Sequence, residues 1–299
     1  MDLANLHQPP FNTTMMGVVK GVLNYYGLPR TDAEVYGLSG HAFLINIHPT
    51  LCPSGPYCWN RAPIFKLIEN LGVRTVPLGF FHAGSSPEER AAIERQVIDA
   101  LDRGEAASLL NMEHQLITGY DETGLMTSQP WECVDFPPKH LTFGFWSEFG
   151  AEIHVDFHRF EKGTPARAED AFEAALRYAV DVYHHGEQHA AAGYLAGAAV
   201  YVAWVHAVEA GHGSSHGHWW NATVWAECRL RAAEFFRDLS EDLAPADLAG
   251  PISEDYMAMS KLLSAASDKE LPVAEKVALL RQASVHEANA IRGIESLLV

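Results

Sequence analysis

The stretch TMMGVVKGVLNYYG, residues 14–27, decides the fold of the first half of this chain. Val18, Val22 and Tyr26 recur on one side at helical spacing, and Gly27 ends the run. The opposite side of the same helix is also largely apolar, so both sides need cover from the rest of the domain. The stretch therefore predicts a helix that is buried inside its domain.

Strand and helix signals alternate on either side of a capped helix that starts at Ser86. Ser86 is followed by proline and then by a capping-box Glu89, and the run continues to Gly104. An Asp-Glu-Thr-Gly turn at 121–124 joins two apolar runs, which is typical of paired antiparallel strands. We expect helices over 64–72 and 86–104, and strands over 41–48, 73–81, 106–121, 124–130, 140–146 and 151–160.

The composition changes near residue 163, where the chain becomes rich in alanine and strand signals stop. Long amphipathic stretches then predict helices over 167–184, 190–209, 218–239, 252–266 and 272–298, which suit a helical bundle. The predicted class is α+β, with an α+β domain at 1–162 and an all-helical domain at 163–299.

Charge and cysteine usage exclude several classes of partner. The formal net charge is −17, whereas nucleic acids and anionic membranes require clustered Lys and Arg. No apolar run reaches the ~18 residues that a membrane span needs, and the N-terminus does not resemble a secretory leader. The four cysteines form no CxxC pair. We expect a cytoplasmic protein without a metal or other cofactor, binding a small molecule or peptide; homo-oligomerisation stays open.

Three separated pieces of the chain suggest a family. Gln8 precedes Thr14 by six residues, the helix that Thr14 opens contains VLNYYG, and His114 opens a run that ends in GYD. These pieces resemble the bacterial papain-like superfamily that includes bacteriocin-leader peptidases and butirosin-biosynthesis acyltransferases, some with a helical C-terminal domain. The resemblance implies a papain-like first domain, and it covers more than two-thirds of the chain, with the helical part matched more loosely.

The resemblance also implies a role for each of four residues. Gln8 would donate to the oxyanion, Thr14 would be the nucleophile and His114 the base, while Gln129 would orient the His114 ring. In the family the nucleophile is cysteine, and the orienting residue is commonly an aspartate. The expected function is therefore acyl transfer, by an acyltransferase or by an amidase or peptidase-like hydrolase, acting on a small molecule or peptide.

Thr14 and Gln129 weaken this chemistry. A hydroxyl needs help from a base throughout its attack, and a neutral amide does not stabilise the imidazolium that results. Loss of the acid from a Ser-type triad costs about four orders of magnitude in turnover. Thr14 could instead cap its helix, or an acid such as Asp121 or Glu113 could compensate. The alternative function is an inactive papain-like relative that binds a peptide or small metabolite between its domains.

Three further groups of residues offer other chemistry. Cys52 and Cys58 lie in a Pro/Gly-rich loop and could supply a displaced nucleophile. A histidine cluster that includes His185 and His189 could hold a metal. The third group lies in the segment GHGSSHGHWWNATVWAECR. There we expect substrate-binding residues that face a cleft, or alternatively aromatic packing; the candidates are His216, Trp219 and Asn221.

Overall fold

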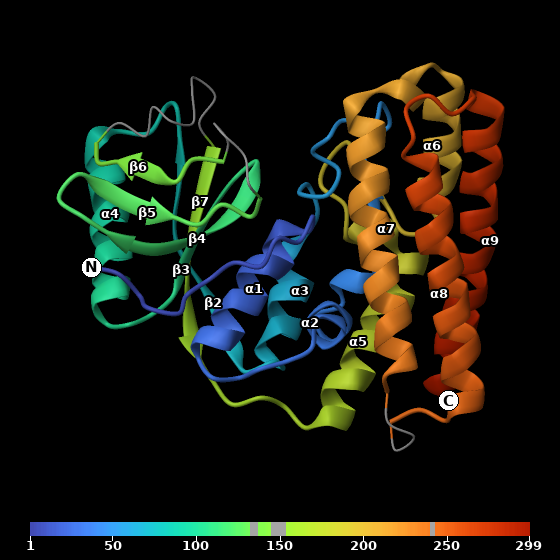
Figure 1. Cartoon of the computed structure of the whole chain (residues 1–299), viewed down its shortest axis with the longest axis horizontal. Helices are drawn as coiled ribbons and strands as arrows, with labels where there is room; N and C mark the ends of the chain where they lie inside the picture. Colours follow the sequence, from blue (N-terminus) through green and yellow to red (C-terminus); the bar gives the residue numbers. More distant parts are fainter. Residues whose placement is uncertain (132–136, 145–153, 240–242) are drawn as a thin grey trace. The chain divides into compact units, whose positions relative to one another are not determined.

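The computed structural model describes residues 1–131, 137–144, 154–239 and 243–299 (Figure 1). The chain forms two compact units, one made of Met1–Arg30 and Ile68–Pro165, the other of Thr31–Leu67 and Ala166–Val299. The α+β class is confirmed, because an antiparallel sheet and a C-terminal helical region are both present. Cys133 and parts of the strands expected at 140–146 and 151–160 lie outside the described residues.

The first unit is built on a six-stranded sheet with strand order β2-β7-β3-β4-β5-β6. Every neighbouring pair of strands is antiparallel, as the Asp-Glu-Thr-Gly turn predicted for the pair joined at 121–124. The strand bounds are β2 (Val73–His82), β3 (Ala107–Asn111), β4 (Glu113–Tyr120), β5 (Gly124–Thr127), β6 (His140–Thr142) and β7 (His154–Lys162).

Helices α1 (Thr14–Tyr25) and α4 (Pro87–Asp102) cover opposite faces of this sheet. The side chain of Leu116 in β4 packs against Gly21 of α1, whereas the α4 residue Ile93 packs against Gly79 of β2. Gly21 is required by close approach, because a Cβ there would lie 2.3 Å from the carbonyl oxygen of His7. The α1 helix is buried on most sides, as its two apolar sides predict.

The second unit is mainly helical, and α7 is in contact with several other elements. It packs against α2 and α8, and α9 packs against α5, α6 and α8. The helix bounds are α2 (Asp32–Leu38), α3 (Arg61–Glu69), α5 (Ala168–His184), α6 (Ala199–Glu209), α7 (His216–Arg237), α8 (Ala246–Ala266) and α9 (Val273–Leu297). The last two residues of α3 belong to the first unit by the division above.

A buried guanidinium explains why residues 31–67 belong with the helical unit rather than with the predicted domain 1–162. Arg229 of α7 donates from Nη1 to the carbonyl oxygens of Ala42 and Leu44, both at 2.8 Å. Its Nη2 donates to Glu287 of α9 at 2.5 Å, and the other oxygen of that carboxylate accepts from the Tyr201 hydroxyl. Burial is the largest single influence on Arg229 and opposes its charge, but Glu287 together with Tyr201, Tyr256 and Cys228 outweighs burial, so the pKa of Arg229 is raised.

Three predicted elements are wrong. The single strand expected at 106–121 is two antiparallel strands, β3 and β4, because Met112, with φ 63°, turns the chain between them. The strand expected at 41–48 is a 3-10 helix η1 (His41–Phe43) followed by the two-residue strand β1 (Asn46–Ile47). In this segment the carbonyl oxygens of Ala42 and Leu44 accept hydrogen bonds from Arg229. The helix expected at 190–209 starts at Ala199. Residues 190–198 include β8 (Leu195–Ala196), which pairs with β1, and Gly193 and Gly197 have φ values of 85° and 66° that end a helix.

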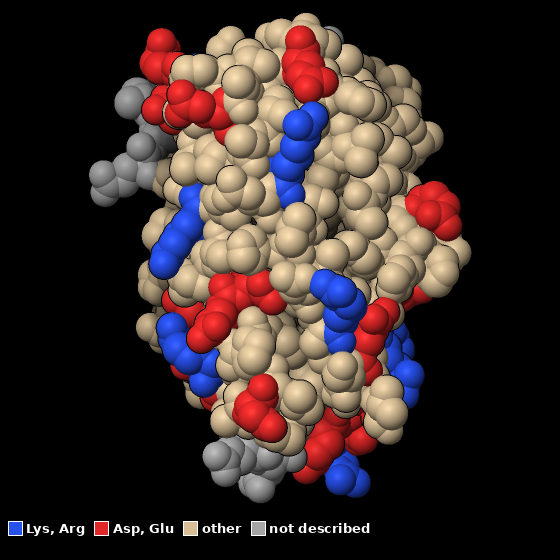
Figure 2. Space-filling view, turned by 90° about the vertical axis from the view of Figure 1, so that its right-hand side faces the viewer, with Lys and Arg blue, Asp and Glu red and all other residues tan. Residues whose placement is uncertain are grey.

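No described helix combines the length and the apolar character that crossing a bilayer requires. The charged side chains on the face shown in Figure 2 lie in small separate groups of both signs, with no continuous basic area on that face. This distribution gives a polyanion no obvious docking surface there.

Candidate functional site

The Thr14 side chain is held by two hydrogen bonds inside the first unit. Its hydroxyl donates to Oε2 of Glu113 at 2.9 Å and accepts from the backbone N–H of His114 at 3.0 Å. The residue is 0% exposed. Thr13 is the N-cap residue of α1, so the alternative in which Thr14 caps this helix is wrong. The hydroxyl instead ties the start of α1 to the start of β4.

Gln8 lies beside Thr14, and its amide is fully engaged with backbone. Its Oε1 accepts from the N–H of Leu116 at 2.8 Å. Its Nε2 donates to the carbonyl oxygens of His114 at 2.8 Å and Thr14 at 3.4 Å. The N–H groups that the resemblance assigned to an oxyanion therefore point at carbonyl oxygens in this structure. Gln8 acts here as a bridge between β4 and α1.

His114 lies on the side of the sheet that α1 covers. It is two residues from Leu116 on a regular part of β4, and alternate residues share a face. The His114 residue is 6% exposed. The structure thus brings Gln8, Thr14 and His114 together, and the Thr14 hydroxyl contacts the backbone N–H of His114.

Glu113 is the acid that reaches Thr14, whereas Asp121 is used elsewhere. Asp121 accepts from the backbone and hydroxyl of Thr123 and from the N–H of Gly124, in the turn between β4 and β5. These hydrogen bonds, with that from the Thr123 hydroxyl contributing most, lower the pKa of Asp121. Glu113 instead places a carboxylate at the N-terminal end of α1, where the helix dipole favours negative charge.

Gln129, the predicted orienting residue, follows β5 and bonds to a nearby loop. Its Nε2 donates to the carbonyl oxygen of Pro137 at 2.5 Å. Gln115, on β4 between His114 and Leu116, makes similar bonds to the carbonyl oxygens of Ser128 and Pro138. Gln115 therefore ties Ser128 and Pro138 to β4, whereas Gln129 bonds within the part of the chain that follows β5.

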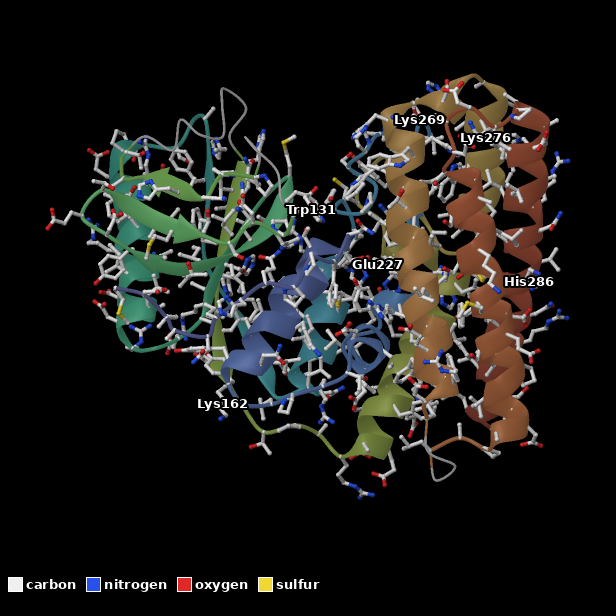
Figure 3. All side chains as sticks on the ribbon, in the orientation of Figure 1. Trp131, Lys162, Glu227, Lys269, Lys276 and His286 are labelled. Atoms are coloured by element: carbon white, nitrogen blue, oxygen red, sulfur yellow. The ribbon has the colours of Figure 1, made fainter. Side chains whose placement is uncertain are left out.

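The predicted substrate-binding residues of α7 divide into two groups within the second unit. The exposed His216 ring lies 5.1 Å from the half-buried Trp219 ring, and the Lys269 ammonium lies 5.4 Å from that ring's centre. Lys269 lies at the end of the helices where α8 connects to α9 (Figure 3). Asn221 is fully buried, and its amide donates to the carbonyl oxygens of Cys52 and Gly217.

Residues 51–58, here called the Cys52 loop, are anchored by side chains of α7 and β1. Besides the Asn221 bond to Cys52, Nε1 of Trp220 donates to the Tyr57 hydroxyl at 3.0 Å. Nδ2 of Asn46 donates to the carbonyl oxygens of Gly55 at 2.6 Å and Cys58 at 3.2 Å. The loop is thus fixed at both ends and in its middle.

Two hydroxyl groups connect the thiols of this loop. The Ser54 hydroxyl donates to the sulfur of Cys52 at 2.8 Å and lies 2.6 Å from the hydroxyl oxygen of Tyr194. Tyr194 is in turn hydrogen-bonded to Cys58. Burial raises the pKa of Tyr194 to about 12, and Cys58 adds to the shift. The sequence analysis singled out both cysteines but missed Ser54 and Tyr194, since no spacing signal connects residues 140 positions apart.

A surface cavity of about 510 Å³ adjoins this cluster in the second unit. Its wall includes Tyr183, Glu187 and Tyr194, with the small residues 190–193 between them. The volume lies within the range of roughly 300–1,000 Å³ that is common for small-molecule sites. Tyr194 therefore connects the Cys52 loop to a space that a ligand could enter.

The histidines that could have held a metal are engaged with carboxylates. His185 and His189 both contact Asp181, at 2.9 and 2.7 Å, and His184 contacts Glu295 at 2.8 Å. Within residues 1–131, 137–144, 154–239 and 243–299, no group of three or more His, Cys, Asp or Glu side chains is arranged to hold a metal ion.

No family model matches this chain, and no curated protein is significantly similar to it in sequence.

Proposed function

We propose that this protein is a papain-like relative that is catalytically silent at Thr14 and binds a small molecule. The proximity of Gln8 to Thr14 and to His114 supports the relationship, because three pieces far apart in sequence meet as the resemblance implies. The same contacts argue against turnover at Thr14.

The observation that carries the proposal is the engagement of the Thr14 hydroxyl. Its proton is donated to Glu113, and a lone pair accepts from the N–H of His114. A nucleophile must instead direct a lone pair at a carbonyl carbon of the substrate while a base within reach takes its proton. Thr14 would have to give up the His114 bond and leave full burial to do so. Breaking a buried hydrogen bond costs roughly 1–3 kcal/mol before any chemistry begins.

The oxyanion side of the reaction is equally unsupported. Catalysis of acyl transfer depends on donors that are already aimed at the position of the developing charge. The side-chain N–H groups of Gln8 already donate to carbonyl oxygens of β4 and α1. Rotation of this amide would leave the buried N–H of Leu116 without its acceptor. Gln8 and Thr14 thus stabilise the first unit.

The cavity beside Tyr194 is the place we assign to the ligand. Its size suits a metabolite, and its wall offers two phenols, a carboxylate and several backbone groups to orient one. An extended peptide would need a longer groove than this local cavity supplies.

Acyl chemistry at Thr14 is tested with 4-nitrophenyl acetate and intact-mass analysis. We expect no acetyl adduct on Thr14, and equal rates of nitrophenol release for the wild type, Thr14→Val and Glu113→Gln, with circular dichroism confirming that the variants fold. An adduct on Thr14 that is lost in Glu113→Gln would refute catalytic silence and identify Glu113 as the base.

Ligand binding is tested by screening a fragment library with ligand-observed NMR. We expect hits that are retained by Thr14→Val and lost by Ala192→Trp, which fills the cavity. Ala274→Trp, an exposed position of α9, is the matched control. Hits that survive Ala192→Trp would move the ligand elsewhere.

A further inference from the structure

The thiols of Cys52 and Cys58 lie on one short, folded loop. Backbone bonds from Gly55 N–H to the Cys52 carbonyl at 3.2 Å and from Cys58 N–H to the Ser54 carbonyl at 3.1 Å turn the chain back on itself. Both thiols are half-buried, whereas the thiol of Cys228 is buried. The loop thus presents two cysteines to reagents from which Cys228 is shielded.

The two sulfurs contact the same pair of hydroxyl groups. Ser54 donates to Cys52, and Tyr194, whose oxygen is 2.6 Å from that of Ser54, bonds to Cys58. The Cys58 contact raises the pKa of the Tyr194 phenol, as expected where the phenol O–H donates to the sulfur. Each sulfur thus accepts from one of the two hydroxyl groups, whose oxygens lie next to each other.

Backbone strain is present next to this pair. Leu51 has φ 55°, in the left-handed region that bulky side chains rarely occupy. Leu51 is 1% exposed, and its carbonyl oxygen would lie 1.8 Å from a Cβ added to Gly217 of α7. Strained backbone persists only where surrounding contacts enforce it, and it is concentrated at functional sites. Here the contacts of α7 enforce it directly before Cys52.

We propose that Cys52 and Cys58 are a dithiol pair that closes into a disulfide when a peroxide oxidises it. The proposal goes beyond the ligand-binding function and does not depend on it. Closure requires the two sulfurs to exchange their hydroxyl partners, Ser54 and Tyr194, for each other.

The chemistry balances with hydrogen peroxide as the oxidant. One cysteine, as thiolate, attacks a peroxide oxygen, the O–O bond breaks, and a sulfenic acid and water result. The sulfur of the second cysteine then displaces the sulfenic oxygen, which leaves as a second water, and the S–S bond forms. The two sulfurs together lose two electrons and the peroxide gains them, while both thiol protons end in water.

The test uses the full chain carrying Cys133→Ser, so that the reacting thiols are those of Cys52, Cys58 and Cys228. The protein is treated with hydrogen peroxide, the remaining thiols are alkylated with N-ethylmaleimide, and the peptides are mapped by mass spectrometry. We expect Cys52 and Cys58 to disappear together as one disulfide-linked peptide, about tenfold or more faster than Cys228, because a buried thiol is inert. Dithiothreitol should restore both thiols.

Single variants distinguish a pair from two independent thiols. In Cys52→Ser and in Cys58→Ser the remaining loop cysteine should stop at sulfenic acid, detectable with dimedone, and Cys228→Ser should behave as the parent. The proposal is overturned if Cys52 and Cys58 are oxidised singly, if each reacts at the same rate when the other is absent and forms no internal disulfide in the parent, or if Cys228 reacts as fast.

Discussion

The Thr14 cluster of the first unit and the Cys52 loop of the second unit both contain nucleophilic side chains. These side chains differ in their burial and in their hydrogen-bond partners. Thr14 is fully buried, and its hydroxyl bonds to Glu113 and to backbone. The loop thiols are half-buried and contact hydroxyl groups, one of which belongs to a residue that lines a cavity. A residue's place in a family pattern therefore says less about its reactivity than its hydrogen-bond partners and its exposure do.

The largest expected effect concerns the buried ion pair of the unit that contains the Cys52 loop. Glu287→Ala leaves the fully buried Arg229 without its carboxylate, and breaking such a pair typically costs about 3–5 kcal/mol. We expect the free energy of unfolding of the helical unit, measured in urea, to fall by this amount. Glu295→Ala removes an exposed pair with His184 and should cost at most about 1 kcal/mol. If both variants lost the same free energy of unfolding, the other hydrogen-bond partners of Arg229 would be enough to stabilise its buried charge.

The next effect tests whether Thr14 is structural. Thr14→Val keeps the side-chain shape but removes the buried hydrogen bonds to the Glu113 carboxylate and from the N–H of His114, so we expect a loss of about 2–3 kcal/mol of stability in urea. Thr118→Val, which removes a long 3.4 Å bond on the same strand, is the control and should cost less. An unchanged stability in Thr14→Val would break the comparison, since Thr14 would then be as free as the loop thiols.

A smaller effect concerns acid stability and His41, beside Trp225 and Trp59 in the second unit. Burial lowers the pKa of His41 to about 3, with a further contribution from Arg229. As the pH falls below about 6.5, a histidine in the unfolded chain becomes protonated, whereas the folded His41 stays neutral until about pH 3. Stability from this residue is thus complete above about pH 6.5 and is lost as the pH falls towards 3.

Between pH 7 and pH 5 this linkage amounts to about 2 kcal/mol. We expect urea midpoints measured across this range to shift accordingly in the wild type. The matched variant His41→Gln should lack this part of the slope, whatever its stability at pH 7. A slope that His41→Gln does not change would mean that other groups govern the acid response.

Much of the fold follows from local patterns. The apolar sides of α1, the Ser86 capping box and the long alanine-rich helices of the second unit are all where spacing predicts them. The errors at 41–48 and 190–198 have physical causes that local spacing cannot show. The first segment presents its carbonyls to Arg229, which is more than 180 residues away in sequence. In the second, glycines with positive φ interrupt an alanine-rich run.

The candidate sites were predictable to different extents. The resemblance anticipated that Gln8 and His114 meet Thr14, but alternation along β4 would put Glu113 on the face opposite to His114. Met112, with φ 63°, turns the chain directly before Glu113, and the carboxylate of this first strand residue reaches Thr14. The link from Ser54 to Tyr194 joins two loops, and loop contacts leave no periodic signal.

The division of the chain between its units has a consequence for synthesis on the ribosome. Residues 31–67 emerge early, but Arg229 and Glu287, which complete their surroundings, are translated long afterwards. At about 5–20 residues per second, this segment waits of the order of ten seconds or more for α7 and α9. Meanwhile the first unit, complete at Pro165, has all its parts. A nascent chain paused near residue 200 would thus hold one finished unit and an exposed apolar segment, which makes it a natural substrate for chaperones.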